Sequence, residues 1–275
     1  MSAPRATLLD DTPARDYTRK LQLFNAFAAP ELRDATGDLR LRPGMRVLDA
    51  GCGSGEALAW LGAEVGPSGL AVGLELSRAH ACSASAKGRV LQADLMRPPV
   101  RPGAFDAVWC VNTLNHLKDP VAGIRTLMAL TRSGGRIAVG QSSLLPDMYF
   151  AWDSRLERVT NEAVRRYYRD RYGLSERDLA GVRAIVGWLK EASLRDVSAR
   201  TLMIERTYPL GAADEAYLLE AIFRGTWGER LRPYLAPADY EELAQLCNPN
   251  SPAFALRRAD FHFLQTFTVA VGEVR

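Results

Sequence analysis

The most constraining feature of this sequence is a glycine-rich loop between an apolar run and a segment with helical periodicity. The apolar run 45–49 continues into Gly51, Gly53 and Gly55, and residues 57–65 repeat apolar side chains at helical spacing. Glycine lets a backbone turn tightly and approach a ligand closely, and the start of the following helix offers free N–H groups. The pattern predicts a ligand site at a strand–loop–helix junction, with a tight turn that binds nothing as the alternative.

The spacing of these glycines does not fit a dinucleotide site. That fingerprint needs a third glycine, but Glu56 stands there when counting starts at Gly51, and Leu58 when it starts at Gly53. The loop is also led by Asp49, whose carboxylate would repel a pyrophosphate but could lie beside a cationic group. The loop therefore favours a ligand such as a sulfonium compound with an α-amino group.

Further apolar runs alternate with helical segments in the first half of the chain. Strands are expected at 70–74, 89–92, 105–111 and 136–140, with a helix at 120–130 before the last of them. Such alternation with short connections is typical of parallel βαβ units.

The remaining segments change this rhythm. An opening helix should begin at Thr12-Pro13 and break at Pro30, and the second half should contain helices at 147–172, 175–190, 213–231 and 237–247 and strands at 197–206 and 261–271. We expect one domain over residues 1–275. Its core comprises 40–145, 176–207 and 261–275, and helical lid segments comprise 1–39, 146–175 and 208–260.

The run from Val47 to Gly55, VLDAGCGSG, resembles the first motif of class I S-adenosylmethionine-dependent methyltransferases, and segments 73–77, 92–95 and 105–112 resemble later motifs. The resemblance implies a Rossmann-like three-layer α/β sandwich: a seven-stranded, mostly parallel sheet with an antiparallel last strand, plus helical lid insertions. It implies S-adenosyl-L-methionine as cofactor, with Glu75 on the ribose hydroxyls and Asp94 on the adenine amino group. The implied cofactor-binding residues are Asp49, Gly51, Cys52, Gly53, Gly55, Glu75, Leu76, Ala93, Asp94, Leu95, Val111 and Asn112.

The sequence offers two candidates for the chemistry of methyl transfer. His116 follows the fourth strand and would be a general base or orient the acceptor, or else pack near the cofactor. Tyr17 lies on the first helix; the resemblance implies that it closes over the methyl group, and the alternative is a core aromatic. His80 is expected on a helix surface. Aromatic residues of the lid segments suit a planar or apolar acceptor, or else belong to the hydrophobic core. They are Trp152, Tyr167, Tyr168, Phe223 and Trp227.

The resemblance favours a small-molecule acceptor, such as a secondary metabolite or a quinone-like compound. One alternative is a fold relative that catalyses another reaction, such as cyclisation. A nucleic-acid or protein methyltransferase is a second, but the Asp/Asn-Pro-Pro-aromatic motif of amino-methylating nucleic-acid enzymes is missing from segment 111–114. A nicotinamide oxidoreductase is disfavoured by the glycine spacing.

Composition narrows the partners and the compartment. The net charge of +3, from 35 basic and 32 acidic residues, is too small to indicate nucleic-acid binding. Cys52, Cys82, Cys110 and Cys247 form no CxxC pair, so neither a metal site nor disulfides are expected. No run reaches the roughly 18 apolar residues of a membrane span. We expect a cytoplasmic protein. The sequence is compatible with a homo-oligomer.

Overall fold

A single mixed β-sheet organises the chain. The computed structural model describes residues 18–142, 149–150, 153–173 and 181–275. Within these residues the sheet has the order β3-β2-β1-β4-β5-β8-β6, and β7 pairs with β8. The strands are β1 (Arg46–Ala50), β2 (Leu70–Glu75), β3 (Arg89–Gln92), β4 (Phe105–Val111), β5 (Thr131–Ser142), β6 (Tyr149–Phe150), β7 (Arg195–Thr207) and β8 (His262–Glu273).

Strand direction follows the expected scheme. Strands β1 to β5 run parallel, whereas β8 lies antiparallel to β5, β6 and β7. The predicted seven-stranded, mostly parallel sheet with an antiparallel last strand is confirmed, and the two-residue β6 is added to it. The expected strands at 89–92 and 105–111 have the observed bounds.

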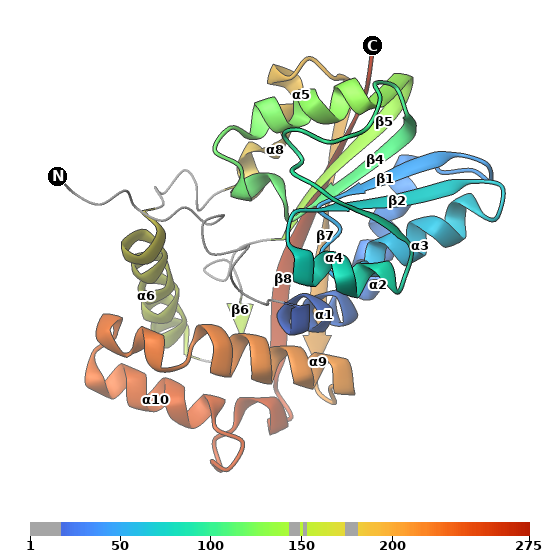
Figure 1. Cartoon of the computed structure of the whole chain (residues 1–275). Coiled ribbons are helices and arrows are strands. Elements are labelled where there is room, and N and C mark those ends of the chain that lie inside the picture. Colours follow the sequence, from blue (N-terminus) through green and yellow to red (C-terminus); the bar gives the residue numbers. More distant parts are fainter. Residues whose placement is uncertain (1–17, 143–148, 151–152, 174–180) are drawn as a thin grey trace.

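Helices cover both faces of the sheet because the side chains of its strands alternate (Figure 1). Val47 and Trp109 face one core cluster, and their neighbours Leu48 and Val108 face the other. Helices α2 and α3 pack into the first cluster, and α5 and α8 into the second. The bounds are α2 (Ala29–Thr36), η1 (Gly37–Leu39), α3 (Glu56–Val65), α4 (Arg78–Ser85), α5 (Pro120–Leu130) and α8 (Gly181–Glu191).

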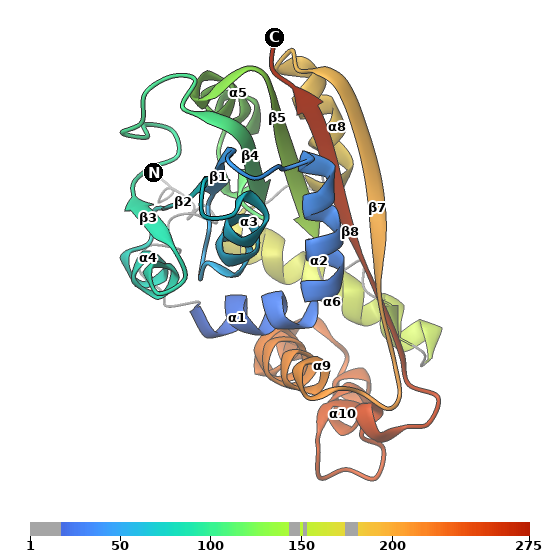
Figure 2. The same ribbon diagram turned by 90° about the vertical axis from the view of Figure 1, so that its right-hand side faces the viewer.

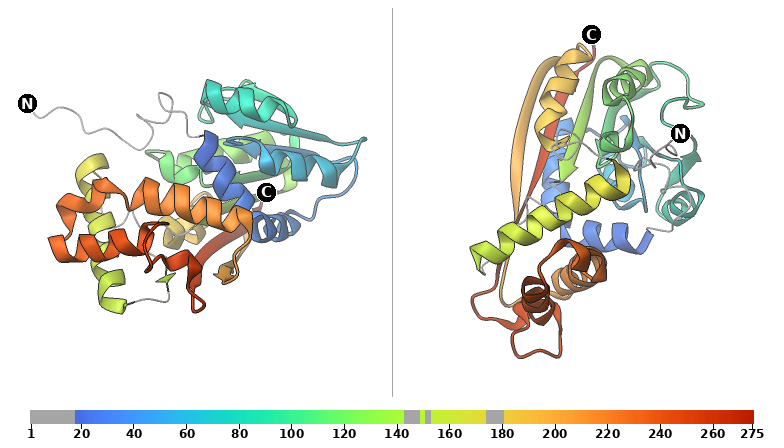
Figure 3. Two further views of the ribbon diagram at one scale, coloured as in Figure 1. Left: turned by 90° about the horizontal axis from the view of Figure 1, so that it is seen from below. Right: turned by 90° about the vertical axis from the view of Figure 1, so that its left-hand side faces the viewer.

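The remaining helices form a cap at one end of the sheet (Figures 1 and 2). Strands β7 and β8 extend into this cap, and α6 runs beside its later helices (Figure 3). The cap comprises α9 (Ala212–Ala216), the π-helix η4 (Tyr217–Thr226), η5 (Glu229–Tyr234), α10 (Pro237–Cys247) and η6 (Ala255–Arg257). Two neighbouring helices, α1 (Thr18–Phe27) and α6 (Ser154–Tyr172), pack against it. Cap residues Leu218, Ile222 and Leu243 share a core cluster with Val47 of the sheet, so cap and sheet have one continuous core.

Several expectations outside the sheet change in detail. The helix expected over 147–172 begins only at Ser154, capped by the Asp153 carboxylate, and Tyr149–Phe150 instead pairs with β8. That part of the prediction is wrong because a tertiary strand pairing overrides helical periodicity. The break near Pro30 is confirmed, since α1 ends at Phe27 and α2 carries this proline in its first turn. Thr12-Pro13 lies outside the described residues.

The helical segment expected over 213–231 is divided into α9, the π-helix η4 and η5. Helix α2, inside the expected lid segment 1–39, packs against α3 and β7 of the sheet layer. In the part of the chain that the structure describes, no helix combines the length and apolar character needed to cross a membrane.

Candidate functional site

The loop after β1 has a backbone that side chains would obstruct. Gly51 has φ +77°, and a Cβ there would lie 2.3 Å from Oγ1 of Thr113. Gly55 has φ +87°, and its Cβ would lie 2.9 Å from Cα of Ala84. Gly55 also caps the start of α3. Both positions require glycine for conformation and for space.

The Glu75 carboxylate, at the end of β2, closes this loop. One carboxylate oxygen accepts a hydrogen bond from the Gly53 N–H at 2.9 Å, and the other accepts from the Ser77 N–H at 2.8 Å. Burial alone would raise the pKa of Glu75, but hydrogen bonds from His80, Ser77 and Gly53 outweigh it and hold this pKa below its usual range. Glu75 is therefore a buried anion that orders the loop.

Asp49, at the end of β1, is in the opposite electrostatic situation. Its side chain is 3% exposed, and Oδ2 has no hydrogen-bond partner among the described residues. Burial, followed by the nearby charges of Glu75 and Glu56, raises the pKa of Asp49 to about 8. A cationic ligand group beside Oδ2 would supply both the missing hydrogen bond and the missing countercharge.

His80 corrects a sequence expectation. It was expected on a helix surface, but it is 3% exposed and its Nδ1 lies 3.8 Å from a Glu75 carboxylate oxygen. Its Nε2 has no partner in the part of the chain described. The physical reason is that Ala81 and Ala84 are also buried, so α4 places this face against the glycine loop. These two small residues are the feature of the sequence that could have indicated the burial of His80.

The residues expected around the adenosine follow β2 and β3. Leu76 is 40% exposed, and Ala93 and Leu95 are more buried. Asp94 is exposed, and its Oδ1 accepts a hydrogen bond from the Met96 N–H at 2.8 Å. Parallel strands bring these segments to one edge of the sheet, because their carboxyl ends lie together.

Asn112 connects the ends of β4 and β5. It has φ +52°, a conformation that asparagine tolerates better than most residues. Its Oδ1 accepts from the Ser142 N–H at 2.8 Å, and its Nδ2 donates to the Ser142 hydroxyl at 3.2 Å. Val111, which precedes it, is half-buried. This amide therefore fixes the sheet edge beside the glycine loop.

His116 ends the short helix η2 (Leu114–His116) just beyond β4. Its Nδ1 is buried without a hydrogen-bond partner among described residues, and so is Oδ1 of the adjacent Asn115. Burial lowers the pKa of His116, and this outweighs the opposing effects of the Glu75 charge and the Asn112 carbonyl. The imidazole is therefore neutral at pH 7 and can accept a proton.

One cavity of about 1010 Å³ joins these groups to the cap. Its wall contains the predicted site residues Asp49, Gly51, Cys52, Gly53, Glu75, Leu76, Ala93, Asp94, Leu95, Val111, Asn112 and His116. Gly55 is not part of this wall, and Tyr17 lies outside the described residues. Wall residues that sequence reasoning did not assign include Lys20, His80, Trp109, Gln141, Ser142, Tyr217, Arg230 and Gln265.

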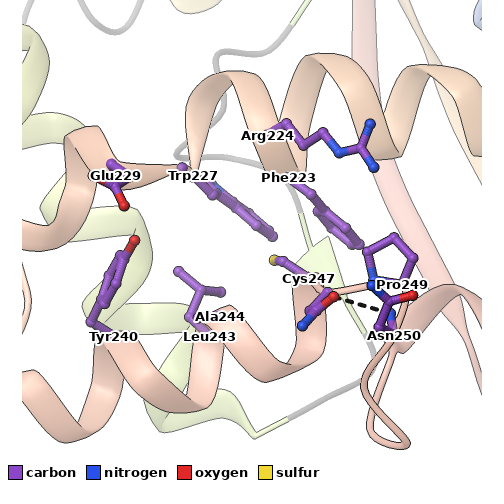
Figure 4. A pocket seen from close by; sticks show the side chains of 12 residues that line it. Phe223, Arg224, Trp227, Glu229, Tyr240, Leu243, Ala244, Cys247, Pro249 and Asn250 are labelled. Atoms are coloured by element: carbon purple, nitrogen blue, oxygen red, sulfur yellow. Dashed lines mark hydrogen bonds between the residues drawn. The ribbon is translucent and has the colours of Figure 1, made fainter.

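The lid aromatics separate into two groups. Tyr167 and Tyr168 line the large cavity. Phe223 and Trp227 stack at 5.7 Å between ring centroids and line a separate hollow of about 420 Å³ between η4 and α10 (Figure 4). Trp152 lies outside the described residues. Across the described ranges, no group of three histidine, cysteine or acidic side chains could hold a metal ion.

Comparison with known proteins places the same segment in a functional family. A family model described as a methyltransferase domain matches residues 48–139. A ubiquinone biosynthesis O-methyltransferase from Xanthomonas campestris is 34% identical over 171 residues, which are 57% of this chain and 66% of that protein. The 27-O-demethylrifamycin SV methyltransferase from Amycolatopsis mediterranei is 35% identical over 117 residues, 40% of this chain and 43% of that protein. The matches thus span just under two thirds and under half of these relatives.

Solved structures resemble the whole fold. The cyclase SpnF has a TM-score of 0.53 and 17% identity over 99% of this chain and 98% of its own. Phosphoethanolamine N-methyltransferase 2 from Haemonchus contortus, crystallised with S-adenosyl-L-methionine, has a TM-score of 0.54 and 16% identity over 96% of this chain and 60% of its own. At such identities the likeness concerns the fold alone.

Proposed function

Because this chain belongs to the class I S-adenosylmethionine-dependent methyltransferases, we propose that it transfers a methyl group from S-adenosyl-L-methionine to a small-molecule acceptor. The observation that carries the proposal is the buried Oδ2 of Asp49, which lacks a partner among described residues and belongs to the wall of the large cavity. The cavity joins this cofactor-type loop to the cap, so it offers room for two molecules.

The residues of the loop fit this cofactor. Asp49 would accept a hydrogen bond from the α-ammonium group, which supplies the cation that its buried carboxylate lacks. The Glu75 oxygens accept from backbone N–H groups and retain lone pairs for the ribose hydroxyls. Asp94 would accept from the adenine amino group. When bound, the cofactor supplies an electrophilic methyl group on a sulfonium.

We propose a hydroxyl group as the methyl acceptor, because the names of both relatives described above refer to methylation of an oxygen atom. His116 would accept the hydroxyl proton, since its buried Nδ1 lacks a partner in the described chain and the ring is neutral. His116 lies just beyond β4 and lines the same cavity as the glycine loop, so it would align the oxygen for in-line attack. Alignment and exclusion of water are the largest contributions an enzyme makes to such a displacement.

The aromatic wall favours a planar acceptor. Tyr167 and Tyr168 from α6, Tyr217 from η4 and Trp109 from β4 all line the cavity. Aromatic side chains bury large flat surfaces at little entropic cost, which suits a secondary metabolite or a quinone-like ring. We also propose a cytoplasmic location, supported by four cysteines that form no disulfide.

The proposal is tested in two steps with the purified protein. Isothermal titration calorimetry with S-adenosylhomocysteine should detect binding, and Asp49→Asn should abolish it. A panel of phenolic and aliphatic alcohols is then incubated with S-adenosylmethionine, and formation of S-adenosylhomocysteine is measured. Product without S-adenosylhomocysteine would identify a cyclase-type relative instead. Absence of binding to the wild-type protein would contradict the assignment of the loop.

A further inference from the structure

Helix α1 presents two different faces to the cavity region. Leu21 approaches the glycine loop, since a Cβ on Gly53 would lie 3.3 Å from it, and Asn25 one turn later donates to Glu56. Lys20, Phe24 and Phe27 are spaced to share another face. Both phenylalanines contact the Tyr217 ring of the cap, at 5.7 and 4.3 Å between centroids. Lys20 therefore belongs to the face of α1 that meets the cap.

The cations around the cavity differ in whether a carboxylate neutralises them. Arg19 donates two hydrogen bonds to Glu220, at 2.7 and 3.2 Å. Lys20 and Arg230 also line the cavity, but neither has a carboxylate partner among the residues that the structure describes. Arg230 also lowers the pKa of Lys20, in addition to the larger lowering by burial. Two cations that line one cavity without a carboxylate partner repel each other.

Arg230 is oriented by an aromatic side chain. Its guanidinium carbon lies 5.6 Å from the centroid of the Tyr167 ring, a cation–π arrangement. Tyr167 itself lines the cavity and packs edge-on against Tyr168 at 5.6 Å. The stack holds the guanidinium beside an aromatic wall, where an anion on a planar molecule could receive its fork of N–H donors.

We propose that Lys20 and Arg230 form an anion subsite that binds a carboxylate or phosphate group of the acceptor, with the ring of the acceptor against Tyr167. The inference rests on the proposed function, which it deepens by naming the acceptor as an aromatic acid or phosphate ester. The anion relieves the repulsion between the two cations, and the subsite lies on the cap side of α1 rather than on its glycine-loop face. The acceptor is therefore held at the end opposite the adenosine groups.

The experiment compares pairs of related ligands in which one member carries an anionic group and the other does not. Calorimetry in the presence of saturating S-adenosylhomocysteine is carried out with 3,4-dihydroxybenzoate and 3,4-dihydroxycinnamate, and with their methyl esters. Phenyl phosphate and phenol provide the phosphate arm. We expect each favoured acid to bind about tenfold or more tightly than its neutral partner, as for a charge-assisted hydrogen-bond pair. The arm with the larger ratio identifies carboxylate or phosphate as the group recognised.

Variants assign this preference to the two residues. Lys20→Met and Arg230→Met should each remove most of the acid preference while S-adenosylhomocysteine affinity stays within about twofold of wild type. Arg224→Gln is the matched control, because it removes an equal charge from η4 at the separate hollow of Figure 4. It should leave the preference unchanged.

Three results would overturn the anion subsite. One is a wild-type protein that binds S-adenosylhomocysteine but binds none of the acids, or binds esters as tightly as acids. Another is a Lys20→Met variant that loses S-adenosylhomocysteine affinity, which would assign this cation to the cofactor carboxylate. A third is an acid preference that survives both variants. Failure of S-adenosylhomocysteine to bind the wild-type protein would instead contradict the proposed function, so the two failures are distinguishable.

Discussion

Replacing Asp49 by asparagine should make the cofactor-free protein more stable at alkaline pH while removing its ability to bind the cofactor. The wild-type carboxyl is 3% exposed, and its pKa is raised from 3.8 to about 8 by burial and by the charges of Glu75 and Glu56. A raised pKa means that the folded state holds the proton more tightly than the unfolded state. Stability linked to Asp49 is thus fully present below pH 4 and is lost as pH rises through 8.

The size of this change in stability follows from the two pKa values of Asp49. Each tenfold change in proton affinity corresponds to about 1.4 kcal/mol, so wild type should lose about 4 kcal/mol relative to Asp49→Asn between pH 5 and pH 9. Urea denaturation of both proteins across this range measures the difference, and titrations of all other groups cancel in it. Parallel stability curves for the two proteins would refute the buried, unpaired state of this carboxyl.

Binding provides an independent check on Asp49. At pH 7 its carboxyl is mostly protonated in the cofactor-free protein, because its pKa is about 8. An ammonium group beside it would favour the ionised form, so binding of S-adenosylhomocysteine should release most of one proton. Calorimetry in buffers of different ionisation enthalpy measures this release. No dependence of the binding enthalpy on the buffer would argue that the ammonium lies elsewhere.

Other variants test the geometry of the glycine loop, the proposed contact of Glu75 with the ribose, and the proposed role of His116 as the base. Gly51→Ala should lower the free energy of unfolding by about 2–3 kcal/mol in thermal or urea denaturation, because φ is +77° and its Cβ would overlap Thr113; an unchanged stability would contradict the geometry. Glu75→Gln should weaken S-adenosylhomocysteine binding by about 1.5–3 kcal/mol in calorimetry; wild-type affinity would exclude its ribose role. His116→Gln should reduce turnover roughly 100-fold without loss of cofactor affinity, and should abolish a wild-type rise in rate with pH below 6.5; a retained pH profile would exclude it as the base.

The sheet and the glycine loop after β1 could be predicted from sequence because they depend on local patterns. Apolar runs of strand length gave the observed bounds at 89–92 and 105–111, and Pro120 together with the Asp119 cap defines the start of α5. Twelve predicted site residues line one cavity because parallel strands end at the same edge. These are consequences of spacing along the chain, which the sequence displays directly.

The cap could not be predicted to the same depth, because its contacts join residues far apart in the chain. Tyr149–Phe150 was expected in a helix but pairs with β8. Element η4 is a π-helix, which the periodicity of apolar residues did not predict. The burial of His80 depends on how closely α4 approaches the glycine loop. The presence of Arg230 in the wall of the same cavity as Lys20 depends on how η5 packs against α6. None of these distances is encoded by periodicity.

The groups expected to meet the cofactor and those expected to meet the acceptor come from different elements of the fold. The groups expected to hold the cofactor stand at strand ends of one sheet, where Glu75 is fixed by two backbone N–H donors and Asn112 by Ser142. The groups expected to meet the acceptor come from α1, α6 and η5, which are joined to the sheet through side-chain packing. Substitution of Arg230 can alter the cavity without displacing the backbone that holds the cofactor. Acceptor preference should therefore change more readily than cofactor preference, because the two depend on different parts of one core.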